Sequence, residues 1–264
     1  MKLLFWNTHR NRNINKYIVD LVEENEIDIV VLAEYDSDII QLDLLLSKNR
    51  KRLHRWNTLG ADRIKIWGNY LDVQPGTQDK YYSLQVVNRE YIICGVHMFS
   101  NLNGERSDER VLLAQQIMNE ISKLRNKINS DKVIILGDIN ESPYDKTSLS
   151  AQGFHGMPSI KEYDDVSRVV CGTKYEKMYN PMWNLFGDFI YPPGTYYRSE
   201  SKLCTSAWYM LDQVIISRPM ISLLKRDDLK IIVECIGEKL YTENKYPDKK
   251  ISDHFPLMCG FNIL

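Results

Sequence analysis

The sequence has little of several features that mark specialised protein classes. No apolar run reaches about 18 residues, so no membrane-spanning segment is expected. The apolar run that begins the sequence is too short for a secretion signal. The cysteines are odd in number and form no CxxC pair, which disfavours a zinc site or a disulfide scaffold and indicates reduced thiols in a cytoplasmic protein. These cysteines are Cys94, Cys171, Cys204, Cys235 and Cys259.

Neither sign of charge dominates the sequence. The 34 Lys and Arg residues oppose 35 Asp and Glu residues, which gives a formal net charge of −1. A nucleic acid partner would therefore have to contact a local basic patch, because the protein offers no global positive field. Hydrophobic residues make up 44% and charged residues 26%, a balance that excludes disordered, fibrous and coiled-coil proteins. With no repeat and no shift in composition, we expect one domain over residues 1–264.

Hydrophobic patterning predicts an α/β protein with two stacked sheets and helices on the outside. Helical spacing covers residues 13–24 and 105–128, and residues 138–206 are expected to be mostly loop. The turn at residues 88–90 predicts a hairpin between the fourth and fifth strands. The expected strands are 2–7, 27–33, 63–67, 81–87, 91–98, 132–136, 208–217, 229–235 and 255–261.

Polar side chains stand where several of these apolar strands begin or end. A charge in such apolar surroundings is costly unless it is paired or binds a metal. We expect these side chains to converge at one edge of the sandwich, where carboxylates at close range need a cation. Carboxylates and amides without cysteine favour Mg²⁺, with Mn²⁺ as a substitute. The residues are Asn7, Glu34, His97, Asp138, Asn140, Asp212, Asp253 and His254.

Each of these residues also has a structural alternative. Glu34 could cap a helix, in competition with Asp36 and Ser37. Asp138 could be a turn residue after a glycine, and a lone strand histidine such as His97 is more often a hydrogen-bonded core residue than a catalyst. The functional interpretation therefore depends on the whole set.

Six motifs follow one another in a fixed order along the chain. They are Phe5-Trp6-Asn7-Thr8, Leu32-Ala33-Glu34-Tyr35, Gly95-Val96-His97-Met98-Phe99-Ser100, Gly137-Asp138-Ile139-Asn140, Leu211-Asp212-Gln213-Val214-Ile215-Ile216-Ser217 and Ser252-Asp253-His254-Phe255-Pro256-Leu257. In this order they resemble the endonuclease/exonuclease/phosphatase superfamily, which has the DNase I-like fold. A single Gly-Asp-x-Asn or Ser-Asp-His motif is weak, but six in order cover nearly the whole sequence.

The resemblance implies a four-layer α/β/β/α sandwich of two mostly antiparallel sheets. It also implies cleavage of phosphate esters that depends on a divalent metal. By position, Glu34 resembles the main metal ligand of the family, assisted by Asn7 and Asp253.

The resemblance also assigns catalytic roles. Asp138 and Asn140 match the pair that orients or activates the attacking water and holds the phosphate. His254, paired with Asp212, matches the histidine that contacts the scissile phosphate. His97 resembles the second histidine of the DNase I, sphingomyelinase and deadenylase-like branches. Because apurinic endonucleases usually have a tyrosine in that role, His97 argues against a dedicated abasic-site enzyme.

Four further residues are candidates for substrate binding. Arg110 begins the long helix, where the resemblance favours a brace for the active-site loops over contact with substrate. Trp183 could stack on a base and Arg198 could hold a phosphate, but the aromatic loop that contains Trp183 could equally pack onto the sandwich. Tyr209 precedes Asp212 by three residues, where an aromatic residue could line a pocket. The basic run at residues 48–55 could grip nucleic acid or be a solvated helix end.

The sequence thus favours a metal-dependent phosphodiesterase with in-line attack by water, acting as a nuclease on DNA or RNA. One alternative is a phosphoesterase of a small or lipid phosphate, such as an inositol phosphate, a nucleotide or a phospholipid. A non-catalytic binding module of the same fold is a further alternative.

Overall fold

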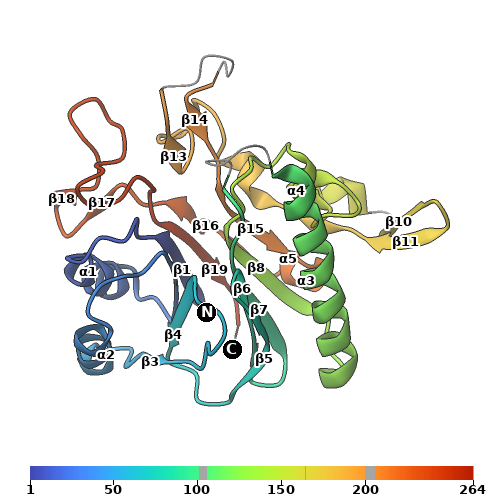
Figure 1. Ribbon diagram of the computed structural model, residues 1–264, viewed down its shortest axis with the longest axis horizontal. Helices are drawn as coiled ribbons and strands as arrows, with labels where there is room; N and C mark the ends of the chain where they lie inside the picture. The colour runs from blue at the N-terminus through green and yellow to red at the C-terminus, as the bar shows by residue number, and fades with distance from the viewer. Residues whose placement is uncertain (101–105, 164, 200–205, 264) are drawn as a thin grey trace.

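Two large β-sheets pack face to face, with helices on their outer sides (Figure 1). The structure is a computed structural model and describes residues 1–100, 106–163, 165–199 and 206–263. Cys204 lies outside these residues. The other four cysteines form no disulfide. Among the described residues, no helix is both long and apolar enough to cross a bilayer.

The first sheet has six strands and mixes parallel and antiparallel pairs. Its first strand is parallel to β2 and antiparallel to β19, so segments from both ends of the sequence meet inside the sheet. In spatial order the strands are β16 (Leu224–Ile231), β19 (Leu257–Phe261), β1 (Lys2–Asn7), β2 (Ile29–Ala33), β4 (Ile64–Gly68) and β3 (His54–Arg55).

The second sheet has seven strands. Its centre is parallel between β7 and β8 and antiparallel between β8 and β15. In spatial order the strands are β5 (Val73–Asp79), β6 (Tyr82–Val87), β7 (Tyr91–His97), β8 (Lys132–Asp138), β15 (Asp212–Ile216), β12 (Met178–Tyr179) and β9 (Gly156–Met157).

Short pairs and helices complete the described chain. The two-stranded pairs are β10 (Ser167–Val170) with β11 (Thr173–Glu176), β13 (Tyr196–Tyr197) with β14 (Trp208–Tyr209), and β17 (Glu234–Cys235) with β18 (Glu238–Lys239). The helices are α1 (Asn15–Asn25), α2 (Ile39–Lys48), α3 (Ser107–Ile128), α4 (Lys146–Leu149), α5 (Arg218–Ile221), η2 (Ile160–Tyr163) and η3 (Pro181–Asn184).

The buried strands are apolar on both faces because each face covers a different neighbour. In β1, Leu3 and Phe5 belong to the apolar cluster between the two sheets, whereas Leu4 and Trp6 belong to the cluster under α1 and α2. Strand β7 divides in the same way, with Cys94 in the cluster beneath α3. Figure 1 shows α1 and α2 flanking one sheet and α3 flanking the other. The predicted four-layer sandwich is confirmed.

Most predicted elements are present. The first six predicted strands, the last strand and both helices lie within two residues of their expected bounds, and β6 pairs with β7 as the expected hairpin. The single strand predicted at 208–217 is wrong, because the chain leaves β14 and enters a different sheet at Asp212. Strand β16 begins at Leu224, five residues before the predicted bound. The region predicted as loop contains β9 and β12, which extend the second sheet.

The helix α2 was not anticipated from the sequence pattern. Its N-cap is Asp38, whose side chain accepts hydrogen bonds from the backbone N–H groups of Ile40 and Gln41. None of the three residues considered above as helix caps, Glu34, Asp36 and Ser37, occupies this N-cap position. Glu34 is therefore free for another role at the end of β2.

Gly95 marks a close approach of the two sheets. A Cβ atom at this position would lie 2.8 Å from Cγ1 of Val31 and 3.1 Å from Cγ2 of Ile64, both on the facing sheet. Any side chain here must push the sheets apart or displace these residues.

We predict that Gly95→Val lowers the free energy of unfolding by about 1–3 kcal/mol, because it overpacks the intersheet core. Chemical denaturation checks this value. Gln74→Val is the control, because Gln74 is exposed on the edge strand β5 and its replacement should change stability by less than about 0.5 kcal/mol. Equal stability of Gly95→Val and the parent would contradict the close approach.

Candidate active site

Three neighbouring strands bring expected site residues into register at one edge of the second sheet. His97 at the end of β7 is the register partner of Asp138 at the end of β8, and Asp138 is also opposite Asp212 at the start of β15. Gly137 precedes Asp138 because a Cβ atom there would lie 2.0 Å from the backbone oxygen of Val96. The glycine of the Gly-Asp motif thus lets β7 and β8 stay paired up to the polar residues.

The first sheet supplies the opposing side of the site. Asn7 ends β1 and donates a hydrogen bond from Nδ2 to Oδ2 of Asp138 at 3.0 Å. Glu34 follows β2, and its Oε1 lies 3.4 Å from Nε2 of His97. The same Nε2 atom lies 3.6 Å from Oδ2 of Asp138. Glu34 and Asp138, from different sheets, therefore face one imidazole.

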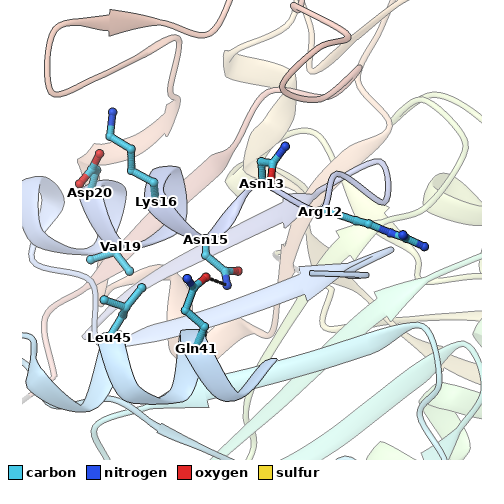
Figure 2. Close-up of a pocket in the computed structure, with 8 residues that line it drawn as sticks. All are labelled: Arg12, Asn13, Asn15, Lys16, Val19, Asp20, Gln41 and Leu45. Atoms are coloured by element: carbon cyan, nitrogen blue, oxygen red, sulfur yellow. Dashed lines mark hydrogen bonds between the residues drawn. The ribbon is translucent and has the colours of Figure 1, made fainter. Parts of the chain in front are cut away.

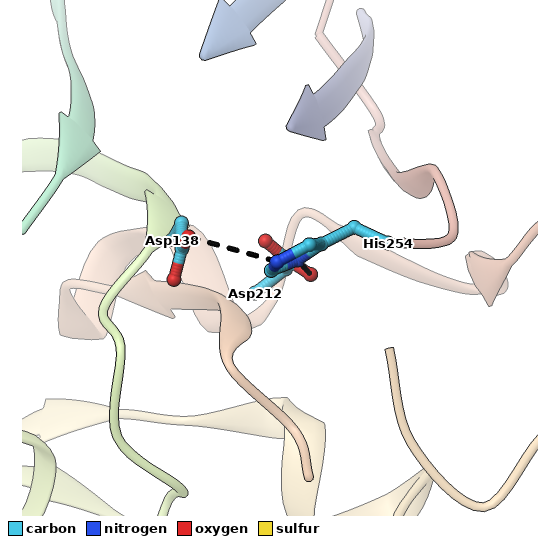
Figure 3. Close-up of side chains that lie close together, drawn as sticks. All are labelled: Asp138, Asp212 and His254. Carbon is cyan, nitrogen blue, oxygen red and sulfur yellow. Dashed lines mark hydrogen bonds and ion pairs between the residues drawn. The ribbon is translucent and has the colours of Figure 1, made fainter. Parts of the chain in front are cut away.

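His254 closes the group from the segment that leads into β19. Its Nδ1 donates to Oδ2 of Asp212 at 2.8 Å, while Nε2 lies 4.0 Å from Oδ2 of Asp138 and 3.9 Å from Oδ1 of Asp253. Figure 3 shows the imidazole between the carboxylates of Asp138 and Asp212. Ser252 accepts from the backbone N–H of His254 at 3.1 Å and donates to the backbone oxygen of Asn7 at 2.7 Å. These contacts tie the histidine to β1.

The two histidines differ in protonation. Burial alone would lower the pKa of His254, but the carboxylates of Asp212, Asp138 and Asp253 outweigh it and raise the pKa to about 10. Burial, with Arg63, His254 and Arg10 nearby, lowers the pKa of His97 to about 3. At neutral pH His254 is therefore an imidazolium and His97 a neutral imidazole.

Burial changes the pKa of the Asp138 carboxyl group. Burial raises its pKa to about 7, and Asp212 adds to the rise, while His254, Asn7 and the backbone N–H of Asn140 oppose it. The ionised carboxylate is thus incompletely compensated by the protein. A nearby cation would supply the missing positive charge.

The donor set fits a hard divalent cation. Asp138, Asp212 and His254 have potential ligand atoms within 4.8 Å of one another. Because His254 is protonated and Nδ1 donates to Asp212, this histidine is a poor metal ligand. Oxygen atoms are the ligands that Mg²⁺ and Mn²⁺ prefer, and the carboxylates of Glu34 and Asp253 supply such atoms beside His97 and His254.

Two of the site residues, Glu34 and Asn140, have a strained backbone conformation. Glu34 has φ of 50° and Asn140 has φ of 57°, both in the left-handed region. This conformation costs about 1 kcal/mol or more per non-glycine residue, so surrounding contacts must hold it. Asn140 donates from its backbone N–H to Oδ1 of Asp138 at 2.8 Å and from Nδ2 to the backbone oxygen of Met98 at 3.2 Å. The strained backbone orients Asn140 beside Asp138.

Arg110 is buried beneath the site. Its guanidinium donates from Nε and Nη2 to Oε1 of Glu141 at 3.0 and 2.8 Å and from Nη1 to the backbone oxygen of Phe99 at 2.7 Å. Glu141 follows Asn140, and Phe99 lies two residues after His97. At 1% exposure, Arg110 connects the loops that follow β7 and β8 and does not face solvent.

The other three candidates for substrate binding, Trp183, Arg198 and Tyr209, lie in surroundings that differ from one another. Trp183 is partly buried, with its ring 6.4 Å from that of Tyr144, and Arg198, the residue directly after β13, is exposed. Tyr209 has its ring 6.3 Å from that of Tyr196. Tyr196 is an aromatic residue beside the site, with its ring 4.8 Å from that of His254.

The basic run at residues 48–55 lies at the other end of the first sheet. Its residues surround the beginning of β2, whereas the site follows the end of that strand. Lys51 contacts Oδ1 of Asp28 at 2.9 Å, and Arg50 contacts Oε1 of Glu26 at 3.3 Å. This placement fits the alternative that the basic run is a solvated helix end, because the run lies away from Asp138.

A hollow of about 430 Å³ lies away from these residues, between α1 and α2. Figure 2 shows the hydrogen bond between Asn15 and Gln41, two of its lining residues, while the Arg12 side chain points away from the other labelled residues. None of the expected site residues lines this hollow. Its lining residues are Arg12, Asn13, Asn15, Lys16, Val19, Asp20, Gln41 and Leu45.

Several residues beside the site were not among the residues predicted from the sequence. His9 places Nδ1 3.2 Å from Oδ1 of Asp253, and Arg10 places Nε 3.7 Å from Oε2 of Glu34. Tyr196 and Ser252 also contact His254. Ser252 could have been found from its motif, but the others occupy stretches whose geometry no pattern specifies.

Solved structures of similar architecture match the full length of this chain. A 3′ phosphatase, NExo from Neisseria bound to a product DNA hairpin, is 15% identical with a TM-score of 0.59, and the match covers 100% of both chains. A humanized TDP2 from D. rerio is 14% identical with a TM-score of 0.59, covering 100% of this chain and 99% of that one. An AP endonuclease from Archaeoglobus fulgidus is 14% identical with a TM-score of 0.55, covering 100% of both chains.

The protein has the DNase I-like fold. At these identities the likeness concerns the fold, which confirms the architecture expected from the six motifs. No protein-family model matches the sequence, and no curated protein sequence matches it either.

We predict that Asp212→Asn lowers the pKa of His254 in metal-free protein. In the parent the raised pKa stabilises the fold fully below pH 6.5, and this contribution is lost as the pH rises toward 10. The variant should therefore show its largest loss of stability relative to the parent at mildly acid pH, just below 6.5, and approach the parent as the pH nears 10. NMR titration of the ring and unfolding at several pH values measure both effects, with the exposed Glu238→Gln as control. A His254 ring that titrates near pH 6.5 in the parent would contradict the assignment.

Proposed function

We propose that this protein is a divalent-metal-dependent phosphodiesterase that hydrolyses nucleic acid. The observation that carries the proposal is the cluster around Asp138, where Asn7, His97 and His254 approach one carboxylate from three strands or segments. Mg²⁺ is the proposed cofactor and Mn²⁺ its substitute, held by Glu34 with Asn7 and Asp253. When bound, the cation would neutralise phosphoryl charge and stabilise the leaving oxygen.

The protein side chains divide the remaining work. Asp138 accepts a proton from the water that attacks phosphorus in line with the leaving oxygen, and Asn140 holds a phosphoryl oxygen beside it. His254 donates from Nε2 to a phosphoryl oxygen as negative charge grows there. Asp212 keeps Nδ1 of His254 protonated and fixes the ring. The buried His97 keeps its neutral ring between Glu34 and Asp138.

A polynucleotide is the proposed substrate because basic and aromatic side chains surround this cluster. Arg10, Tyr196 and His9 lie beside the site residues, and the structural neighbours named above include a phosphatase bound to DNA. The near-neutral net charge keeps a small or lipid phosphate ester as the second candidate substrate. We further propose that residues 1–264 form one domain and that the protein works in the cytoplasm, where its free thiols stay reduced.

We predict that the protein cleaves labelled DNA or RNA with Mg²⁺ or Mn²⁺ and that EDTA abolishes cleavage. Asp138→Asn should reduce turnover by about 1,000-fold or more, because the amide cannot accept the proton. Gel analysis of cleavage and mass analysis of the product ends measure these effects.

The matched control is Asp36→Asn, which changes an exposed acidic side chain outside the cluster. It should cleave like the parent. Products from inositol phosphates, nucleotides or phospholipids, with all oligonucleotides intact, would favour the second substrate class. Cleavage by Asp138→Asn at the parental rate would refute the proposed site.

A further inference from the structure

The loop after β1 carries two basic side chains to two carboxylates of the site. His9 reaches Asp253 and Arg10 reaches Glu34, and these carboxylates are both proposed metal ligands. The two basic residues are adjacent in sequence, so one short turn serves both contacts. Neither residue belongs to the six motifs.

The turn that presents them is strained. The backbone N–H of Asn11 donates to the oxygen of Thr8 at 3.0 Å, and the two central residues of this β-turn have positive φ, 48° at His9 and 54° at Arg10, as in a type I′ turn. Such turns favour Asn-Gly, because both central residues need positive φ. Here His and Arg occupy those positions.

Hydrogen bonds to Glu34, the residue directly after β2, hold the turn in place. Thr8 donates from Oγ1 to the backbone oxygen of Glu34 at 2.9 Å, and the backbone N–H of Arg10 donates to the same oxygen at 3.0 Å. The backbone N–H of His9 donates to Oδ1 of Asn7 at 3.1 Å. The position of Arg10 is therefore fixed relative to Glu34, while its side chain remains 74% exposed.

The ion pair between Arg10 and Glu34 is loose. Its 3.7 Å separation is longer than a hydrogen bond, so the guanidinium gains only charge attraction and keeps its N–H donors available. A guanidinium can place two parallel hydrogen bonds on a phosphate. A divalent cation on Glu34 would weaken the attraction between Glu34 and Arg10 and leave the guanidinium beside the substrate phosphate.

Resting on the function proposed above, we propose that Arg10 is a phosphate-binding residue of this site. Glu34 holds it in the metal-free protein, and it turns to a phosphoryl oxygen of the substrate once Glu34 binds the cation. Arg10 thereby opposes metal binding in the free protein and favours substrate binding in the loaded one.

Arg12 provides a matched control in the same loop. Its Nε lies 3.6 Å from Oδ2 of Asp36, and its side chain is 82% exposed, so the ion pair resembles that of Arg10 in both respects. Asp36 is not among the residues around Asp138. Arg10→Gln and Arg12→Gln therefore remove the same charge from similarly exposed arginines, of which Arg10 faces a carboxylate of the site and Arg12 does not.

Two binding measurements test the proposal without turnover. Calorimetry measures the affinity of the protein for Mn²⁺ alone, and fluorescence anisotropy measures binding of a labelled DNA oligonucleotide with Mn²⁺ in the Asp138→Asn background. Arg10→Gln should bind Mn²⁺ about two- to fivefold more tightly and the oligonucleotide about tenfold more weakly. Arg12→Gln should change each affinity by less than about twofold.

Tighter binding of Mn²⁺ together with weaker binding of the oligonucleotide distinguishes a phosphate-binding role of Arg10 from a structural role. Weaker binding of both Mn²⁺ and oligonucleotide by Arg10→Gln, with a lowered unfolding midpoint, would make Arg10 a brace for Glu34 and overturn the proposal. Unchanged oligonucleotide binding would also overturn it. If the parent binds both ligands as expected but cleaves nothing, the proposed function fails while the assignment of Arg10 as a phosphate-binding residue stands.

Discussion

Asp138 is a buried carboxylate at a point where two strands and a second sheet bring further charges close to it. The low dielectric of this edge makes every uncompensated charge costly, so the neighbours must offset one another. His254 does this as an imidazolium fixed by Asp212, and Asn7 does it with a donated hydrogen bond. The remaining negative charge of Asp138, Glu34 and Asp253 is what makes the edge suitable for a cation. The chemistry of the site thus follows from how the sandwich distributes buried charge.

Much of the fold could be predicted because buried strands need apolar residues on both faces. Strands such as β2 and β8 have continuous apolar runs, and their bounds follow from composition. Strand β5 contains Pro75, Gly76 and exposed polar residues, since it lies at the sheet edge, and it has no such signal. Helix α2 is apolar at nearly consecutive positions, with Ile40 and Leu44 exposed, so its helical period is obscured.

The site residues also divide into those that the sequence could predict and those that it could not. Residues such as Asp138 and His254 could be predicted because polar side chains at the ends of apolar runs are costly and because their motifs follow a known order. His9, Arg10 and Tyr196 could not, because their positions depend on a turn conformation and a hairpin placement. A His-Arg pair gives no local reason to expect positive φ. Tertiary contacts to Glu34 impose that conformation, and these contacts exist only after β1 and β2 have paired.

The placement of β1 between β2 and β19 has a consequence for a chain that is still being synthesised. Its strand partner on one side, and the His254 that precedes this partner, are separated from β1 by about 250 residues of intervening sequence. Pairing over such a distance cannot begin until β19 has been synthesised, and closing so long a loop costs conformational entropy. A nascent chain that has made β1, β7 and β8 but not β19 has Asn7, His97 and Asp138 without the imidazolium that completes their cluster. Translation therefore delays assembly of the cluster until nearly the whole described chain has left the ribosome.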